Sequence, residues 1–338
     1  MSALVKEAPL IELKGVSRRF GKRADFAARL AQKMGLAKPH PIVRAVDNVD
    51  LSVRKGEVLG LVGESGCGKS TLGRVVAGII PPSAGAVMWR GRDRAALSAQ
   101  EQRDARLKVQ MVFQNPYASL NPRRSVSDIV SEAPRIHGLI SGDKNAFVDQ
   151  QLTRAGLDPA LKRRYPHQFS GGQRQRIGIA RALAVNPEFI ICDEAVAALD
   201  VSIQAQIINL FMDLRDNLNL TYLFISHDLG VVEHISDRVA IMYLGRIVEQ
   251  APTEEVFMRP NHPYTQALLA EAPRIETTKR SFTPMTGELP SPLAPPPGCH
   301  FHPRCPHAFA RCRVEAPALK EIAPGHVSAC HLNDGATA

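Results

Sequence analysis

The chain has 338 residues, 44% of them hydrophobic, and a formal net charge of +9. This length predicts about two domains with room for a full core, and no apolar run reaches the ~18 residues that a membrane-spanning helix needs. Residues 1–10 contain Lys6, Glu7 and Pro9 and no apolar stretch, so we expect no secretory signal and a cytosolic chain. The basic residues are scattered, which favours a solvated surface with a phosphate site over a nucleic-acid-binding surface.

The first part of the chain predicts strands that lead into a glycine-rich turn. These strands cover residues 10–16, 46–53 and 58–62, and residues 21–44 form an insertion-like stretch. Residues 63–71 read Gly-Glu-Ser-Gly-Cys-Gly-Lys-Ser-Thr, and the apolar residues 72–80 predict a helix after them. Strand, glycine turn and helix are the context of a nucleotide-phosphate loop. The predicted phosphate contacts are Gly63, Glu64, Ser65, Gly66, Cys67, Gly68, Lys69, Ser70 and Thr71.

The parts of this loop have separate chemical tasks. The glycines leave room for the backbone to curl around a polyphosphate, and the N–H groups at the start of the next helix face the anion. Lys69 reaches the β- and γ-phosphates, and the Ser70 hydroxyl is placed to bind Mg²⁺. The loop therefore predicts a site for a nucleoside triphosphate with magnesium.

The middle of the chain predicts strands that alternate with helices. Predicted strands cover residues 109–113, 189–192 and 221–226, and predicted helices begin after the Ser98 capping box and cover 171–185 and 203–217. Between them, residues 122–169 read as a helical insertion that is interrupted by glycine and proline. This alternation predicts an α/β fold with a parallel-sheet core.

Two carboxylates follow the predicted strand at 189–192. An acidic residue at such a strand end can hold Mg²⁺, so Asp193 is a predicted metal ligand. The next residue, Glu194, can polarise an attacking water as a general base. Two acids after an apolar strand are weak evidence alone, but together with the phosphate loop they predict nucleotide hydrolysis.

A second glycine motif lies at residues 169–173, which read Phe-Ser-Gly-Gly-Gln. A serine N-cap followed by two glycines presents bare N–H groups to an anion. The motif resembles the signature of ATP-binding cassette (ABC) ATPases. The resemblance implies a P-loop NTPase cassette with a parallel-sheet core, an antiparallel edge and an inserted helical subdomain. It also implies nucleotide contacts from Ser170, Gly171, Gly172 and Gln173.

Other residues fall in the order expected of this family. Gln114 resembles the Q-loop glutamine, which senses Mg²⁺ and the attacking water, and His227 resembles the switch histidine at the γ-phosphate. Asp200 resembles the D-loop aspartate. Phe20 resembles the aromatic residue that stacks on adenine, although alone it would more often be a core residue. Residues 195–197 read Ala-Val-Ala where the family usually has Pro, then Thr or Val, then Ser, so we expect weaker coupling between sites rather than a dead enzyme.

The family mechanism implies an ATPase that works as a dimer. Two cassettes meet head to tail, and each ATP lies between the phosphate loop of one cassette and the signature of the other. Closure and opening of the pair then deliver mechanical work to a partner. The chemistry is phosphoryl transfer to water, controlled by positioning and charge neutralisation.

A closer resemblance is to the ATPase subunits of bacterial oligopeptide and dipeptide importers, above all to the second of their two unequal ATPases. It runs over about residues 10–331 and rests on the stretches 63–71, 112–122, 165–173, 198–206, 262–268 and 287–292. It implies a second ATPase subunit, two membrane permease subunits, an extracytoplasmic substrate-binding protein and a place on the cytoplasmic face of the membrane. The alternative is an ABC-type ATPase acting on nucleic acid or ribosomes, which the single phosphate loop and the lack of a heptad run disfavour.

The last cysteines predict a metal site. Four of the six cysteines, Cys299, Cys305, Cys312 and Cys330, follow a proline-rich stretch that begins after about residue 280. A cytosolic location disfavours disulfides, and four thiolates can bind Zn²⁺ or an iron–sulfur cluster. Their spacing does not choose the metal, and nearby histidines could replace a thiolate. A similar tail in the peptide-importer family is associated with a [4Fe–4S] cluster.

These observations predict two parts of the chain. Residues 1–280 form an ABC ATPase domain that includes a helical subdomain at about 122–170. Residues 281–338 form the proline-rich linker and a small Cys-rich C-terminal module.

Overall fold

The computed structural model describes residues 8–21, 41–271 and 287–335. Most of the predicted insertion at 21–44 lies outside the described residues. Within the described ranges, no helix is both long and apolar enough to cross a membrane.

The main sheet has eight strands in the order β11-β12-β10-β9-β3-β8-β7-β6. Its strands are β3 (Val58–Val62), β6 (Val109–Val112), β7 (Phe189–Asp193), β8 (Thr221–Ile225), β9 (Arg238–Tyr243), β10 (Arg246–Pro252), β11 (Lys320–Ala323) and β12 (His326–Ser328). The central strands β9, β3, β8, β7 and β6 pair in parallel, and the strands beyond β9 pair antiparallel. The carboxyl ends of β3, β7 and β8 therefore meet at one edge, where open α/β sheets bind their ligands.

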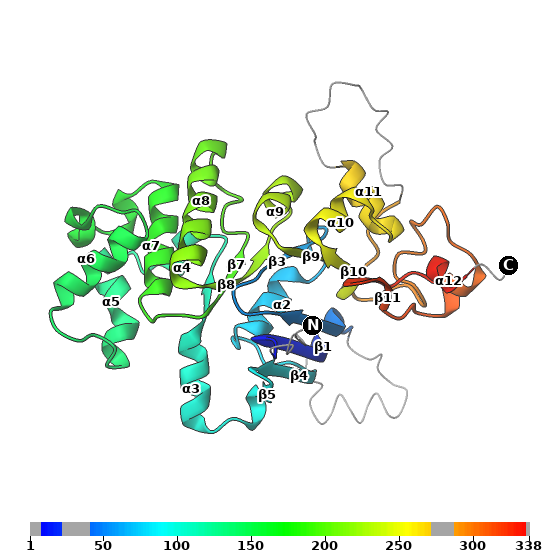
Figure 1. The fold of residues 1–338 in the computed structure, drawn as a ribbon, viewed down its shortest axis with the longest axis horizontal. Helices are drawn as coiled ribbons and strands as arrows, with labels where there is room; N and C mark the ends of the chain where they lie inside the picture. The colour runs from blue at the N-terminus through cyan, green and yellow to red at the C-terminus, as the bar shows by residue number, and fades with distance from the viewer. Residues whose placement is uncertain (1–7, 22–40, 272–286, 336–338) are drawn as a thin grey trace, which may run out of the picture.

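A second, antiparallel sheet lies against the first with a helix between them (Figure 1). Its order is β2-β1-β4-β5, and its strands are β1 (Ile11–Phe20), β2 (Val43–Val53), β4 (Ala84–Trp89) and β5 (Arg92–Asp93). Helix α2 (Lys69–Val76) packs against both sheets, and its buried Leu72, Val75 and Val76 join one apolar core with β1, β2 and β3. This core fixes the start of α2 at the sheet edge.

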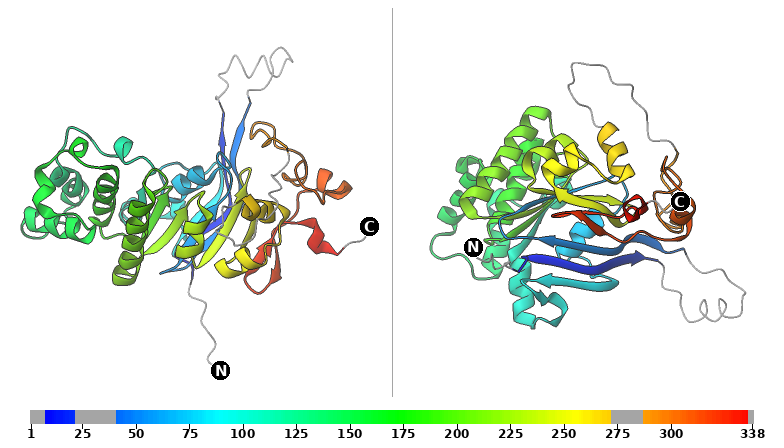
Figure 2. Two further views of the ribbon diagram at one scale, coloured as in Figure 1. Left: turned by 90° about the horizontal axis from the view of Figure 1, so that it is seen from above. Right: turned by 45° about the vertical axis from the view of Figure 1, so that its right-hand side comes forward.

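The remaining helices divide into two groups. Helices α4 (Pro116–Ser119), α5 (Val126–Ile136), α6 (Lys144–Arg154) and α7 (Gly171–Leu183) gather at one end of the molecule (Figures 1 and 2). The others are α3 (Ala99–Lys108), α8 (Val201–Leu218), α9 (Leu229–Ile235), α10 (Thr253–Met258), α11 (Pro263–Glu271) and α12 (Ala310–Val314). The predicted helical stretch at 122–169 is divided because Ser125 and Asp143 cap separate helices with their side chains.

The described C-terminal segment, residues 287–335, continues the main sheet at the opposite end from α5–α7 (Figure 2). Strand β12 pairs with β10 through Glu249 and Gln250. The fully buried Glu249 carboxylate accepts the N–H groups of Asn261 and His262 at 2.7 and 2.9 Å and lies 2.7 Å from His326 Nε2. Phe301 is 1% exposed and belongs to the main core. Burial and hydrogen bonding thus join this segment to the cassette.

His262 makes this junction sensitive to acid. Its ring is 1% exposed, Nδ1 accepts the Tyr264 N–H at 3.0 Å, and burial lowers the pKa of the ring to about 4. The unfolded chain takes up a proton near the ordinary pKa of about 6.5, whereas the folded chain resists it. The contribution of His262 to stability is therefore present above about pH 6.5 and is lost as the pH falls towards 4.

We expect the free energy of unfolding to fall by up to about 3 kcal/mol over this range because of His262. Urea unfolding of the wild type and of His262→Gln across the same pH range measures this term. The variant should lose less stability on acidification than the wild type. Equal slopes of unfolding free energy against pH would assign the acid sensitivity to other groups.

Candidate active site

The predicted phosphate loop connects β3 to α2 and curls tightly against its neighbours. Gly63 and Gly68 have φ of +156° and +112°. A Cβ atom at Gly63 would lie 2.1 Å from the Met242 carbonyl oxygen, and one at Gly68 would lie 2.0 Å from that of Ala45. Only glycine fits at these two positions, because both the backbone conformation and the space exclude a side chain.

Lys69 is the first residue of α2, and its amino group lies inside the curve of the loop. Nζ donates to the carbonyl oxygens of Gly63 at 2.6 Å and Glu64 at 3.0 Å, and the residue is 5% exposed. The loop borders a pocket of about 490 Å³. The pocket is lined by Phe20, Val43, Ala45, Ser65, Gly66, Gly68, Lys69, Ser70, Thr71, Gln114, Glu194 and Pro292. The buried cation and the turned loop together make an anion site.

Ser70 and Asp193 meet at the end of β7. Ser70 Oγ donates to Asp193 Oδ1 at 2.7 Å, and Asp193 is 4% exposed. Burial raises the pKa of Asp193, against the lowering effects of the Ser70 hydrogen bond and of Arg74 and Lys69. A hydroxyl and a buried carboxylate offer the hard oxygen donors that Mg²⁺ takes in proteins, so the predicted metal ligands fit the ion.

Two other predicted residues, Gln114 and His227, lie beside the Glu194 carboxylate. Gln114 Nε2 donates to its Oε2 at 2.6 Å, and His227 Nδ1 lies 3.5 Å from its Oε1. The Glu194 backbone has a φ of +48°, and its N–H donates to the Ile225 carbonyl oxygen at 2.9 Å. Such a conformation costs roughly 1–3 kcal/mol in a residue other than glycine, and it aims the carboxylate at the loop. Gln114, Glu194 and His227 thus lie together just after the ends of β6, β7 and β8.

Phe20 lines the same pocket as the phosphate loop, Gln114 and Glu194. It is 36% exposed, and the Arg18 guanidinium carbon lies 4.6 Å from its ring centroid. Pro292 lines the same pocket, and its carbonyl oxygen accepts the Arg44 N–H at 3.3 Å. No local sequence signal pointed to Pro292, because the contact joins segments almost 250 residues apart.

The signature residues do not line this pocket. Ser170 caps α7 by accepting the Gln173 N–H at 3.3 Å, and Gln173 Oε1 accepts the Ser170 N–H at 3.0 Å. Ser170, Gly171 and Gln173 are exposed. Asp200 is also exposed at the start of α8, and Leu199 beside it lies close to Gly171. The structure therefore brings signature and D-loop together on a surface away from the phosphate loop of the same chain.

Ala197 lies on that exposed surface, and its N–H donates to the Glu194 carbonyl oxygen at 3.2 Å. We predict that Ala197→Ser increases the cooperativity of ATP hydrolysis, because the family resemblance implies a dimer interface on this surface, across which the added hydroxyl would hydrogen-bond. Folding stability should change by less than about 0.5 kcal/mol, as is usual for exposed positions. The dependence of turnover on ATP concentration measures the coupling, with Ala99→Ser on exposed α3 as control. Unchanged turnover and cooperativity would refute the predicted role.

The four C-terminal cysteines are free, and the Cys299 N–H donates to the Cys312 carbonyl oxygen at 2.9 Å. Burial raises the pKa of Cys299 to about 11, and the thiols of Cys312, Cys330 and Cys305 contribute to the shift. Burial also raises the pKa of Cys305 and Cys330. Among the described residues, however, no group of three or more His, Cys, Asp or Glu side chains has a metal-binding arrangement. The described residues therefore give no support to the predicted iron–sulfur or zinc site.

Comparison with known proteins identifies two matching family models. The one described as ABC transporter matches residues 46–197, and the one described as oligopeptide/dipeptide transporter, C-terminal region, matches residues 248–312. The oligopeptide transport ATP-binding protein AppF of Bacillus subtilis (strain 168) is 50% identical over 328 residues, which cover 96% of this chain and 97% of AppF. The probable peptide ABC transporter ATP-binding protein y4tS of Sinorhizobium fredii is 51% identical over 300 residues, which cover 88% and 85% of the two chains.

Solved structures show the same fold. The dimeric post-hydrolysis structure of the ATP-binding cassette MJ0796, bound to ADP and Pi, superposes with a TM-score of 0.60 at 27% identity. The match covers 72% of this chain and 98% of MJ0796. The cbiO1 structure from Clostridium perfringens, part of the transporter complex cbiONQ, gives a TM-score of 0.60 at 26% identity over 75% and 92% of the chains.

Proposed function

The chain belongs to the ABC transporter ATPases, and on that premise we propose that it is the ATP-hydrolysing subunit of a membrane importer of oligopeptides, dipeptides or related solutes. Its relatives named for oligopeptide and peptide transport align over most of the chain. The observation that carries the proposal is the convergence of Gln114, Glu194 and His227 beside the phosphate loop. The alternative of an ATPase acting on nucleic acid or ribosomes finds no support in the matched families.

ATP binds in the pocket between Phe20 and the phosphate loop. Phe20 stacks on the adenine, and the loop N–H groups with Lys69 hold the phosphates. Ser70, Asp193 and Gln114 hold Mg²⁺, which neutralises charge on the phosphate oxygens when it is bound. The 2.7 Å contact between Ser70 and Asp193 supports this ligand set.

Glu194 acts as the general base that takes a proton from the attacking water. Gln114 holds one oxygen of its carboxylate at 2.6 Å, and His227 lies near the other. His227 contacts the γ-phosphate, so the base and the phosphate sensor occupy one site. The left-handed backbone conformation of Glu194 supports a functional role, because strained residues of this kind cluster at active sites, where the surrounding structure keeps them in place.

The active unit is a head-to-tail pair of cassettes, with a second, non-identical ATPase as the partner. Ser170, Gly171, Gly172, Gln173 and Asp200 complete the site of the opposite subunit. Their position outside the pocket of their own chain supports this arrangement. MJ0796, with the same fold, was solved as a dimer.

Two permease subunits and an extracytoplasmic substrate-binding protein complete the importer, which places this chain on the cytoplasmic face of the membrane. Residues 115–125 line the groove for a permease helix. Tyr117 there is 60% exposed, while the Arg174 guanidinium carbon lies 3.6 Å from its ring centroid. The ring thus contacts Arg174 of helix α7 and is still exposed enough to contact a permease.

We also propose the division of the chain into an ABC domain at 1–280, with a helical subdomain at about 122–170, and a C-terminal unit at 281–338. In that unit Cys299, Cys305, Cys312 and Cys330 bind a [4Fe–4S] cluster, with Zn²⁺ as the alternative. Two observations support the proposal: the Cys299 N–H donates to the Cys312 carbonyl oxygen at 2.9 Å, and the cysteine pattern resembles the tail of the peptide-importer family.

Co-purification from the native membrane in mild detergent tests the function. Mass spectrometry should find two permease subunits and a second, different ATPase with this chain, and metal analysis should find iron in the same preparation. Ribosomal proteins or nucleic acid in place of permeases would overturn the importer. Zinc without iron would replace the cluster, and the absence of both would reject the metal site.

A further inference from the structure

Glu64, the second residue of the phosphate loop, is held by two groups from the C-terminal part of the chain. Its backbone N–H donates to the Tyr264 hydroxyl at 2.9 Å. Its carboxylate accepts Arg304 Nη1 at 2.9 Å on one oxygen and 3.1 Å on the other. The Arg304 and Glu64 side chains are only 8% and 21% exposed, so water screens this pair weakly.

Tyr264 belongs to an aromatic cluster with Tyr243 and Phe301, and Arg304 lies three residues after Phe301. Tyr264 and Phe301 are 0% and 1% exposed. The Tyr264 ring centroid lies 4.6 Å from that of Tyr243 and 5.4 Å from that of Phe301. Arg304 follows Phe301 by one tight turn, since its N–H donates to the Phe301 carbonyl oxygen at 3.0 Å. Packing in this cluster therefore fixes where the guanidinium meets the loop.

The charge of Glu64 matters because the loop receives an anion. Its carbonyl oxygen accepts from Lys69 Nζ at 3.0 Å, so the residue that carries this carboxylate is part of the loop around the phosphate-binding ammonium group. An unpaired carboxylate there would repel a triphosphate and compete for Lys69. A buried guanidinium that pairs with it removes this repulsion.

We infer that Arg304 is a positioning residue for ATP: it neutralises Glu64 and fixes the phosphate loop from 240 residues further along the chain. The C-terminal segment is then part of the nucleotide site rather than an appendage to it. Pro292 from the same segment lines the pocket near Phe20, which gives a second contact of this kind. The inference rests on the proposed ATP site but adds to it a residue that lies outside all of the cassette motifs.

The test measures ATP affinity of the full chain with a fluorescent ATP analogue. Arg304→Gln should weaken binding about tenfold, because it leaves the Glu64 charge unpaired at an effective dielectric constant of about 20. Adding Glu64→Gln to that variant should restore binding to within about threefold, because the repelling charge is gone. Rescue by a second substitution is not expected if Arg304 only stabilises the fold.

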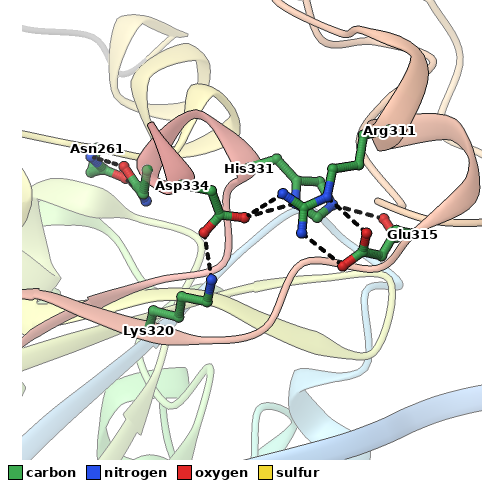
Figure 3. Close-up of polar contacts among 7 residues, drawn as sticks. Asn261, Arg311, Glu315, Lys320, His331 and Asp334 are labelled. Carbon is green, nitrogen blue, oxygen red and sulfur yellow. Dashed lines mark hydrogen bonds and ion pairs between the residues drawn. The ribbon is translucent and has the colours of Figure 1, made fainter. Parts of the chain in front are cut away.

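The matched control is Arg311→Gln in the same segment. Arg311 bonds Glu315 at 2.7 and 2.9 Å and Asp334 at 2.9 Å, as Figure 3 shows, and touches no residue of the loop through these bonds. It should bind ATP as the wild type does. If Arg304→Gln does not fold, Arg304→Lys takes its place, with an expected threefold loss because the more strongly hydrated ammonium group does not reproduce the geometry of the guanidinium pair.

Three results separate the possibilities. Unchanged affinity in the folded Arg304 variant overturns the inference, and so does a double variant that binds no better than Arg304→Gln. A wild-type chain that binds no ATP rejects the proposed function itself, and the inference falls with it.

Discussion

Glu194→Gln is expected to reduce ATP turnover by about 10²–10⁴-fold, the usual range for loss of a general base. The amide keeps the volume of the side chain and can still bond Gln114, which now donates to Glu194 at 2.6 Å. It cannot accept a proton from water at neutral pH. ATP affinity should therefore stay near the wild-type value, while the rate of phosphate release from the assembled transporter should fall by the same factor as turnover.

A control for this variant lies at the other end of the same strand. Glu188 precedes β7 and pairs at the surface with Arg90 and Lys108. Glu188→Gln removes a carboxylate from the same strand without touching the pocket, so turnover should remain within about twofold, as expected for a surface pair. Near-normal turnover in Glu194→Gln would remove Glu194 from the role of base and point to another group.

Lys69→Met should weaken ATP binding about 10- to 100-fold and abolish turnover at ordinary ATP concentrations. Charge-assisted hydrogen bonds contribute roughly 1.5–3 kcal/mol each, and the buried ammonium has no substitute within the loop. The variant also leaves the carbonyl oxygens of Gly63 and Glu64 without the donor that now lies at 2.6 and 3.0 Å. Titration with a fluorescent ATP analogue measures the loss directly.

Lys55→Met is the matched control, because Lys55 is exposed in the turn between β2 and β3. It should bind and hydrolyse ATP normally. If Lys69→Met and Lys55→Met bind ATP equally well, residues 63–71 are not the phosphate site, whatever their resemblance to one.

Local sequence predicted those parts of the fold whose signals are local. The strand at 58–62 is β3, the helix at 171–185 is α7 with Ser170 as its cap, and the strand at 189–192 is β7 extended by one residue. Each has a continuous apolar run or a side-chain cap that needs no distant partner. Strand β4 was not predicted: at its start Ala84 pairs with Ser17 of β1, and Gly85 lies at an irregularity in this pairing.

The motifs marked Ser70, Asp193, Gln114 and Glu194 as site residues. In the structure Ser70 is hydrogen-bonded to Asp193, and Gln114 to Glu194. The left-handed backbone of Glu194 and the contact of Arg304 with Glu64 could not be read from spacing, because tertiary packing alone creates them. For the same reason, the antiparallel continuation of the sheet through β12 was not foreseen.

The most direct test of the proposed function is uptake of a labelled oligopeptide by cells in which Glu194→Gln replaces the native chain. We expect uptake to be lost while the variant is still produced, assembles with its membrane partners and binds ATP. Undiminished uptake in those cells would contradict it, because peptide import would then not depend on ATP hydrolysis at this site.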